Sequence, residues 1–295
     1  HANKWPLLPA ADARAKFAPG NKGMLGSGAN GMVFKMALAE NPDAPLAVKI
    51  SDDAMGKWEV QTNCKLLPLL LAHHTENFAR VYEAFASKLT FDPSIEPNGD
   101  FAETKETMVW IVEELVDKTY GEIFSHGEPF HETLLFEETW LNFICAKYLS
   151  GRLSDSHDRN YAILKHAPFV RVYHIDGSVY LIPKGLPMLK RIDVMIGTST
   201  VRDMKPGGYG RATTSAGTGS TRHWRVGLVK PEKREANYPF ARADAIEEAM
   251  EELPERPDDG TFNGFLSRLF TGLVTTPVYL EQLEAEGEEV RHFYA

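Results

Sequence analysis

The stretch DSHDRN, residues 155–160, places an acid and an amide five positions apart in a short polar segment. The carboxylate of Asp155 can orient an attacking hydroxyl group and accept its proton. The amide oxygen of Asn160, together with a second acid, can hold Mg2+ against the phosphates of a nucleotide. Because the pattern D-x-H-x-x-N is short enough to arise by chance, its meaning depends on the motifs that lie upstream.

The composition is that of an ordinary globular protein with one large domain or two smaller ones. The chain has 295 residues, of which 43% are hydrophobic and 25% charged. Its net charge of -9 argues against nucleic acid or an anionic membrane as the main partner, because both are bound through basic surfaces. The longest apolar run, near residues 66–72, contains Pro68 and is shorter than the roughly 20 residues that span a bilayer. We therefore expect no nucleic-acid partner and no membrane span.

Cys64 and Cys145 are the only cysteines of the chain. Both lie in apolar helical patterns, so we predict free buried thiols rather than a disulfide bridge. Free thiols are typical of a reducing compartment, which favours the cytoplasm.

Hydrophobic periodicity divides the chain into a strand-rich first part and a helix-rich remainder. Strand patterns cover residues 23–50, 78–85, 108–115, 161–164, 169–175 and 178–182. Helical patterns cover residues 53–71, 131–150, 242–253, 262–273 and 277–293. Residues 197–235 are rich in Gly, Thr, Ser and Arg and predict a long irregular loop. The predicted organisation is an N-terminal extension over 1–22, a first lobe over 23–115 and a second over 116–295, with a nucleotide in the crevice between the lobes.

Residues 26–33, GSGANGMV, have the pattern G-x-G-x-x-G-x-V between two strand-like runs. Glycines let the backbone approach phosphates without a Cβ clash. A dinucleotide-binding fingerprint would need a helix after the third glycine, but residues 32–35 continue as a strand. The pattern therefore favours a glycine-rich hairpin that covers nucleotide phosphates, with a plain hairpin turn as the alternative.

Lys49 lies in the apolar strand Ala47-Val48-Lys49-Ile50, where its ammonium group needs a partner. Such a lysine can contact the α- and β-phosphates of a nucleotide and pair with a glutamate on a helix. Glu59 on the next helix is the best candidate, ahead of Glu40 and Glu76. The interval between Lys49 and Glu59 is short, so the helix or its lead-in must be abbreviated. The alternative is a lysine on an edge strand that faces water.

Residues 110–115, WIVEEL, form an apolar strand that ends in an acidic pair. This pattern suits a segment that connects two lobes, where backbone groups near Glu113 and Leu115 would hydrogen-bond an adenine edge. An ordinary strand end explains the side chains equally well.

Two acids are candidates for the second metal ligand. Asp176 is followed by Gly177 between two alternating runs, which is typical of a two-residue hairpin turn and gives Asp176 a structural explanation. Asp193 follows a strand and precedes the Gly- and Thr-rich segment. We favour Asp193 as the metal ligand, with Asp176 as the alternative.

In this order and spacing, the motifs resemble those of the protein kinase-like superfamily over about residues 20–200. The resemblance implies an α+β fold of two lobes, with a small β-rich N-lobe, a larger helical C-lobe, and ATP and Mg2+ as cofactors. It assigns the nucleotide to Gly26, Ser27, Gly28, Gly31, Val33, Lys49, Glu113 and Leu115. It assigns the chemistry to Asp155 as catalytic aspartate, Lys49 with its partner Glu59, and Asn160 and Asp193 as metal ligands.

The motifs also depart from those of ordinary protein kinases. Leu153-Ser154-Asp155 replaces H-R-D, and His157 stands where a lysine is usual. This loop looks like that of aminoglycoside and choline phosphotransferases, phosphatidylinositol kinases and atypical protein kinases such as haspin. Residues 193–195, DVM, replace D-F-G, and no A-P-E motif follows. The chain thus resembles divergent kinases of the viral and bacterial effector type. His157 would either contact the transferred phosphate or shape the loop.

The sequence therefore predicts an ATP- and Mg2+-dependent phosphotransferase that acts on Ser or Thr hydroxyl groups of proteins. Basic side chains after Gly197 would receive an acidic or phosphorylated substrate, or lie in a solvated loop; they are Arg202, Lys205, Arg211 and Arg222. One alternative is a small-molecule or lipid kinase on the same scaffold. Another is a pseudokinase that binds nucleotide and serves as a scaffold. The expected location is the cytoplasm, which for a viral protein means the host cytoplasm or the virion.

Overall fold

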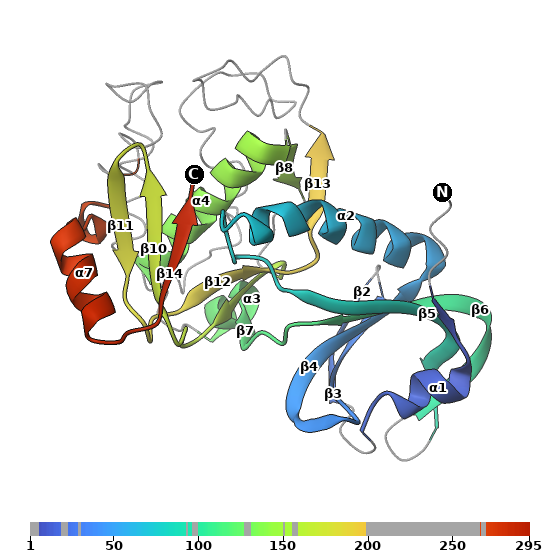
Figure 1. Cartoon of the computed structure of the whole chain (residues 1–295). Coiled ribbons are helices and arrows are strands. Elements are labelled where there is room, and N and C mark those ends of the chain that lie inside the picture. The colour runs from blue at the N-terminus through green and yellow to red at the C-terminus, as the bar shows by residue number, and fades with distance from the viewer. Residues whose placement is uncertain are drawn as a thin grey trace. The chain divides into compact units, whose positions relative to one another are not determined.

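A computed structural model of the chain describes residues 6–18, 23–28, 31–92, 94–95, 100–126, 131–149, 151–154, 159–198, 266 and 270–295. The protein is of mixed α+β class, as predicted (Figure 1). It divides into two compact units. Unit 1 comprises His1–Cys64 and Ala79–Val116, and unit 2 comprises Lys65–Phe78 and Asp117–Ala295. Each unit has its own hydrophobic core.

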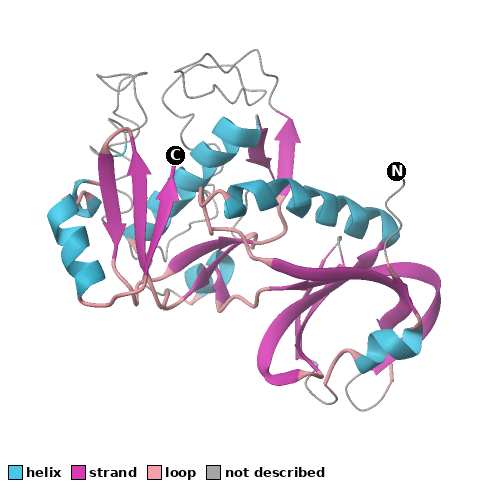
Figure 2. Ribbon diagram, in the orientation of Figure 1, coloured by secondary structure: helices cyan, strands magenta, loops and turns pink. Residues whose placement is uncertain are grey.

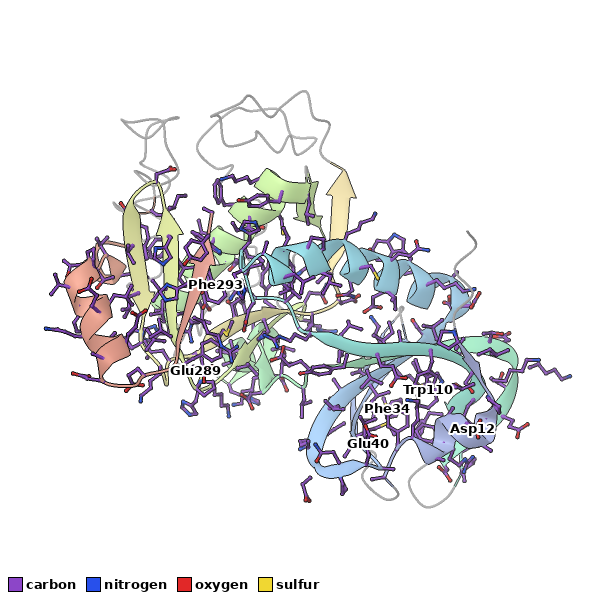
Figure 3. All side chains as sticks on the ribbon, viewed as in Figure 1. Asp12, Phe34, Glu40, Trp110, Glu289 and Phe293 are labelled. Carbon is purple, nitrogen blue, oxygen red and sulfur yellow. The ribbon has the colours of Figure 1, made fainter. Side chains whose placement is uncertain are left out.

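Unit 1 is built on a six-stranded sheet with the order β1-β5-β6-β4-β3-β2. Its strands are β1 (Leu7–Leu8), β2 (Gly23–Gly28), β3 (Gly31–Leu38), β4 (Asn41–Asp52), β5 (Val81–Asp92) and β6 (Asp100–Glu113). Neighbouring strands are antiparallel except for β1, which runs parallel to β5. One face of the sheet buries an aromatic cluster in which Trp110 stacks against Phe17 and Phe85, with Phe34 in the same core (Figure 3).

The segment before residue 23, which the sequence predicts to be an extension, contributes to this core. Strand β1 pairs with Ala86 and Ser87 of β5. The short helix α1 (Ala10–Ala15) follows, and both Ala13 and Phe17 are buried. Since α1 has only six residues, its apolar positions are too few to produce a recognisable helical period.

Helix α2 (Asp53–Leu71) has the predicted bounds, and its residues 53–64, which belong to unit 1, pack on the opposite face of the unit 1 sheet (Figure 1). It begins directly at the end of β4, without a connecting loop. The carboxylate Oδ1 of Asp52 accepts a hydrogen bond of 2.9 Å from the N–H of Met55, which is the bond of an N-cap. The abbreviated lead-in that the sequence predicts is therefore confirmed.

Gly56 lets α2 approach the sheet closely. A Cβ atom at this position would lie 2.4 Å from Cβ of Val109, which is far inside normal contact distance. One turn further on, Val60 packs against Val109 and Ile111. Glycine costs helix stability, so its presence in the first turns of α2 is explained by this approach.

Unit 2 combines helices with small sheets around a second core. Its helices are α3 (Tyr120–Ser125), α4 (Glu132–Leu149) and α7 (Pro277–Ala285), with a 3-10 turn η4 (Thr271–Leu273). Its strands are β7 (Lys118–Thr119), β8 (Gly151–Ser154), β9 (Tyr161–Leu164), β10 (Val170–Ile175), β11 (Ser178–Ile182), β12 (Met188–Arg191), β13 (Met195–Thr198) and β14 (Val290–Tyr294). Among the described residues these strands form sheets of the orders β11-β10-β14, β12-β9-β7 and β13-β8 (Figure 2). Unit 2 is thus richer in strands than the predicted helix-rich remainder.

Helix α4 passes through the centre of unit 2 and matches the predicted helix over 131–150. Its side chains are buried along most of its length, including Phe136, Trp140 and Ile144 at 0% exposure. A helix that is apolar on all sides is expected to be enclosed by other elements.

The hairpin predicted at Asp176-Gly177 is confirmed. Strands β10 and β11 are antiparallel, with Ile175 opposite Ser178, and the two turn residues have φ values of 46° and 82°. Positive φ at both central residues is the requirement of a type I′ turn.

The helix predicted over 277–293 is wrong beyond Ala285. Gly287 has a φ of 79°, and its N–H donates to the carbonyl of Glu284 while the N–H of Glu288 donates to that of Leu283. This pair of bonds is the Schellman motif that ends a helix. Strand β14 then pairs in parallel with β10. The predicted helix at 242–253 and residues 199–235 of the predicted loop lie outside the described residues, as do residues 262–265 and 267–269.

Both cysteines are free, and Cys145 is buried as predicted. Cys64 in α2 is exposed, so the prediction of a buried thiol is wrong there. In the part of the chain that the structure describes, no helix is long and apolar enough to cross a membrane.

Replacing Gly56 by alanine tests the helix–sheet contact. The added Cβ would collide with Val109, and overpacking of this kind costs about 1–3 kcal/mol. Alanine regains roughly 1 kcal/mol of helix propensity, so we expect a net loss of about 1 kcal/mol in the free energy of unfolding. Urea denaturation measures it. Gly23→Ala is the control, because the nearest atom to a new Cβ there is 3.8 Å away. A Gly56→Ala variant as stable as the control would contradict the contact.

Candidate functional site

A row of cross-strand neighbours in unit 1 joins the glycine-rich hairpin to Lys49. Gly26 of β2 lies opposite Val33 of β3, and Val33 lies opposite Lys49 of β4. Lys49 in turn lies opposite Ile111 of β6. Directly opposed residues project to the same face of a sheet, so the Lys49 side chain points to the face that α2 covers. The predicted hairpin form of the glycine motif is confirmed by the antiparallel pairing of β2 and β3.

On that face, Lys49 forms the ion pair that the sequence predicts. Its Nζ lies 2.7 Å from Oε2 of Glu59, and the two side chains are only 6% and 4% exposed. The alternative of an edge-strand lysine that faces water is therefore wrong. The other two candidate glutamates lie in different surroundings. Glu40 is exposed, and Glu76 forms an ion pair with Arg291 at 2.7 Å.

The glycines of the hairpin fall into two groups. Gly31 has a φ of 128°, and a Cβ there would lie 2.3 Å from the carbonyl oxygen of Ile50, so packing and backbone conformation both require glycine. A Cβ at Gly26 or Gly28 would meet no described atom within 4 Å, and neither residue has a positive φ. The described part of the hairpin therefore does not require glycine at 26 or 28, which leaves the close approach of a ligand as a reason for it. Ala29 and Asn30 lie outside the described residues.

Glu113 and Leu115, the predicted adenine contacts, lie where β6 ends. The Glu113 side chain is 9% exposed, and Leu115 is half-buried. The neighbouring Glu114 is fixed by its N–H, which donates to the carbonyl of Arg80 at 2.8 Å. Unit 1 ends one residue after Leu115, at Val116.

In unit 2, the structure brings Asn160 and Asp193 to the same end of a strand pair. Strands β9 and β12 are antiparallel, with Tyr161 opposite Arg191. Just beyond this pair, the N–H of Ile192 donates to the carbonyl of Asn160 at 3.0 Å. The two predicted metal ligands therefore lie on adjacent strand ends, with Asn160 5% exposed and Asp193 half-buried.

The segment that flanks Asp193 also lies beside the described residues on either side of positions 155–158. Strand β8 pairs with β13, which places Ser154 opposite Met195. Since Asn160 is bonded to Ile192, the residues on both sides of positions 155–158 lie next to residues 192–195. Asp155 and His157 themselves lie outside the described residues.

Asp176 and Asp193 share an unusual backbone conformation but differ in its cause. Both have a positive φ, 46° and 49° respectively. The turn between β10 and β11 accounts for Asp176. Asp193 lies between β12 and β13 and not in a two-residue turn, so it keeps a conformation that costs roughly 1–2 kcal/mol for an L-residue. Backbone strain of this kind is concentrated at functional sites.

The pair Asn160 and Asp193 fits Mg2+ that arrives with a nucleotide. Mg2+ is usually held by one or two carboxylates together with substrate phosphates and water. Within the described ranges, no group of three or more His, Cys, Asp or Glu residues could hold a metal ion on its own. A site with few protein ligands is therefore the kind that these residues can form.

Sequence reasoning missed several polar residues that hold this region in place. Asn77 donates from its side chain to the carbonyl of Leu189, and its own carbonyl accepts from the N–H of Arg191. Glu137 is fully buried in α4 and accepts a bond from the N–H of Leu189. The available signal was the acidic pair Glu137-Glu138 inside an otherwise apolar helical pattern.

The described residues thus provide a buried lysine–glutamate pair and a glycine hairpin in unit 1, and an amide–carboxylate pair in unit 2. A nucleoside triphosphate is bound by groups of these kinds: an ammonium group, backbone N–H groups and oxygens that hold a metal ion. No family model matches this chain, and no curated protein matches it.

A double-mutant cycle tests the Lys49–Glu59 pair. Removing one partner of a buried ion pair leaves the other charge uncompensated and costs about 3–5 kcal/mol. We therefore expect Lys49→Met and Glu59→Leu each to lower the free energy of unfolding by that amount, measured in urea. The double variant should recover most of the loss, because two apolar side chains can replace a buried pair. Single variants that each lose less than about 1 kcal/mol would show that the pair is not buried as described.

Proposed function

We propose that this chain is an ATP- and Mg2+-dependent phosphotransferase with a bilobal, protein kinase-like fold. Unit 1 would be the N-lobe and unit 2 the C-lobe. The observation that supports this most is the buried Lys49–Glu59 pair, which lies in register with a glycine-rich hairpin. A buried ion pair adds little net stability, so its retention favours a role in binding.

In unit 1, Lys49 would contact the α- and β-phosphates of ATP. Glu59 holds the ammonium group in one position, which lowers the entropy lost when a nucleotide binds. The backbone at Gly26 and Gly28, where the fold leaves open space, would approach the phosphates, with Ser27 between them. Backbone groups near Glu113 and Leu115 would bind the adenine edge.

In unit 2, Asn160 and Asp193 would hold Mg2+, which supplies charge neutralisation at the phosphates when bound. Asp155 would orient the acceptor hydroxyl group and take its proton. Its two flanking segments lie beside residues 192–195, which supports a position close to the metal ligands. His157 would contact the transferred phosphate or shape the loop.

The acceptor we propose is a Ser or Thr hydroxyl group of a protein, in the cytoplasm. The free cysteines support a reducing compartment. A small-molecule or lipid acceptor is the second candidate, because the pattern D-x-H-x-x-N resembles the loops of kinases for such substrates. Incubation with labelled ATP, of a protein mixture in parallel with a panel of small alcohols and lipids, distinguishes the two.

Replacing Asp155 by alanine tests the catalytic assignment. General-base catalysis contributes roughly 100- to 10,000-fold, so we expect phosphoryl transfer to fall by that factor with an unchanged melting temperature. Asp158→Ala in the same segment is the matched control and should retain activity. Transfer from labelled ATP is the measurement. Activity that survives in Asp155→Ala would overturn the assignment.

A second pair of variants tests which aspartate binds the metal. Asparagine tolerates positive φ as well as aspartate does, so Asp193→Asn and Asp176→Asn should both fold. Losing even an outer-shell partner of a metal costs about 10- to 100-fold in affinity. We expect Asp193→Asn to raise the Mg2+ concentration for half-maximal transfer by at least about tenfold. Asp176→Asn should leave it unchanged, and the reverse result would move the metal site to Asp176.

A further inference from the structure

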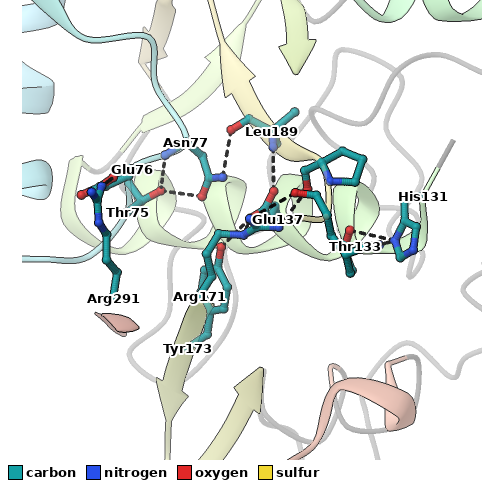
Figure 4. Close-up of polar contacts among 12 residues, drawn as sticks. Thr75, Glu76, Asn77, His131, Thr133, Glu137, Arg171, Tyr173, Leu189 and Arg291 are labelled. Atoms are coloured by element: carbon teal, nitrogen blue, oxygen red, sulfur yellow. Dashed lines mark hydrogen bonds and ion pairs between the residues drawn. The ribbon is translucent and has the colours of Figure 1, made fainter. Parts of the chain in front are cut away.

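Strand β12, which leads to Asp193, is the outer strand of the order β12-β9-β7, and its other edge faces no named strand of the described residues. At the end of that edge, Phe78 forms a single parallel bridge with Arg191. On the other side, the N–H of Leu189 donates to Oε2 of Glu137 at 2.7 Å, and its carbonyl accepts from Nδ2 of Asn77 at 3.0 Å (Figure 4). At Leu189, a carboxylate and an amide thus take the place of the backbone of a neighbouring strand.

Glu137 is itself held rigidly. Its Oε1 accepts from the hydroxyl of Tyr173 at 2.7 Å and lies 2.8 Å from Nε of Arg171, with both charged side chains at 0% exposure (Figure 4). Arg171 also donates to the carbonyl of Pro187 at 2.8 Å, just before β12. The ion pair therefore contacts the chain at two points, Pro187 and Leu189, on the approach to Asp193.

A stability role alone explains this arrangement poorly. Burying a carboxylate and a guanidinium has a large desolvation cost, and well-packed apolar side chains often replace such a pair without loss. What apolar side chains cannot do is accept the hydrogen bond from the backbone N–H of Leu189. The specific contribution of Glu137 is therefore to fix the position of the β12 backbone.

The fixed strand continues directly into the candidate metal ligands. The N–H of Arg191 donates to the carbonyl of Asn77 at 2.6 Å, and the N–H of Ile192 to that of Asn160. Asp193 follows with its φ of 49°. A strained conformation persists only where the surrounding structure holds it, and the bonds to Leu189, Arg191 and Ile192 provide that hold.

We infer that Glu137 is a positioning residue for the candidate metal site: through Leu189 it fixes β12 and thereby aligns Asp193 with Asn160. This inference rests on the proposed function, because it assumes that the two side chains bind Mg2+. Asn77 acts in the same way on the carbonyl of Leu189. Glu137 itself would contact neither nucleotide nor metal.

Two double variants separate positioning from stability. Glu137→Leu/Arg171→Met and Glu137→Gln/Arg171→Met both remove the buried charges, but only glutamine keeps an oxygen that can accept from Leu189. The readout is the affinity for Mg2+ in the presence of a non-hydrolysable ATP analogue, measured by calorimetry, together with amide hydrogen exchange of β12. We expect the leucine variant to bind Mg2+ at least about tenfold more weakly and to exchange Leu189 faster. The glutamine variant should stay within about threefold of wild type.

Thr139→Val is the control, because it removes a buried side-chain bond in the same helix, to the carbonyl of Leu135, that involves neither Glu137 nor β12. It should leave Mg2+ affinity unchanged. Asn77→Ala covers the case in which the leucine variant does not fold, and it should weaken Mg2+ binding in the same direction. Equal Mg2+ affinity in Asn77→Ala and wild type, or in the two double variants, would overturn the inference alone. A wild-type protein that binds no Mg2+ with the analogue would overturn the proposed function, and the inference with it.

Discussion

The buried pair of Lys49 and Glu59 is the constraint on which the arrangement of unit 1 depends. An ammonium group inside an apolar sheet face must have a charged partner, and that partner has to come from an element that packs closely on the sheet. Helix α2 meets this demand because it starts directly after the last residue of β4, without a loop, and because Gly56 permits contact at Val109. The short interval between lysine and glutamate is thus the consequence of a strand that turns directly into its covering helix.

Unit 2 uses the same physical device for a different element. Glu137 and Arg171 are buried as deeply as Lys49 and Glu59, but they act on backbone groups at Pro187 and Leu189. In unit 1 the pair fixes a side chain, and in unit 2 it fixes a strand. In both cases the charged pair lies beside residues that the nucleotide and metal assignments need. In both units, buried charges that add little net stability thus fix the position of a side chain or a strand near a candidate binding residue.

Much of the fold is predictable from long segments with a local pattern. The helix over 53–71 has apolar positions at helical spacing, the helix over 131–150 is indicated by its long apolar composition, and the hairpin at Asp176 by its turn pair between alternating runs. The strand β14 is not predicted, because residues 277–293 keep a helical pattern and the stop signal at Gly287 is a single residue. The N-terminal segment and the short strands β8 and β13 have too few residues for a period. Their pairing is set by contacts distant in sequence, which no local pattern encodes.

The candidate site was predictable only in its chemistry. Residue type and order indicate Lys49, Glu59, Asn160 and Asp193, but whether a glycine or an aspartate is required by the fold or by a ligand depends on its surroundings. The structure separates these cases because it shows whether the packing or the turn of a residue's own element requires that residue type. Gly31 and Asp176 are explained by the close approach of β4 and by a type I′ turn. In the part of the chain that the structure describes, Gly26, Gly28 and Asp193 have no such explanation from their own elements. A bound ligand would explain a strained backbone, as at Asp193, or an open space, as at Gly26 and Gly28, that the local structure does not account for.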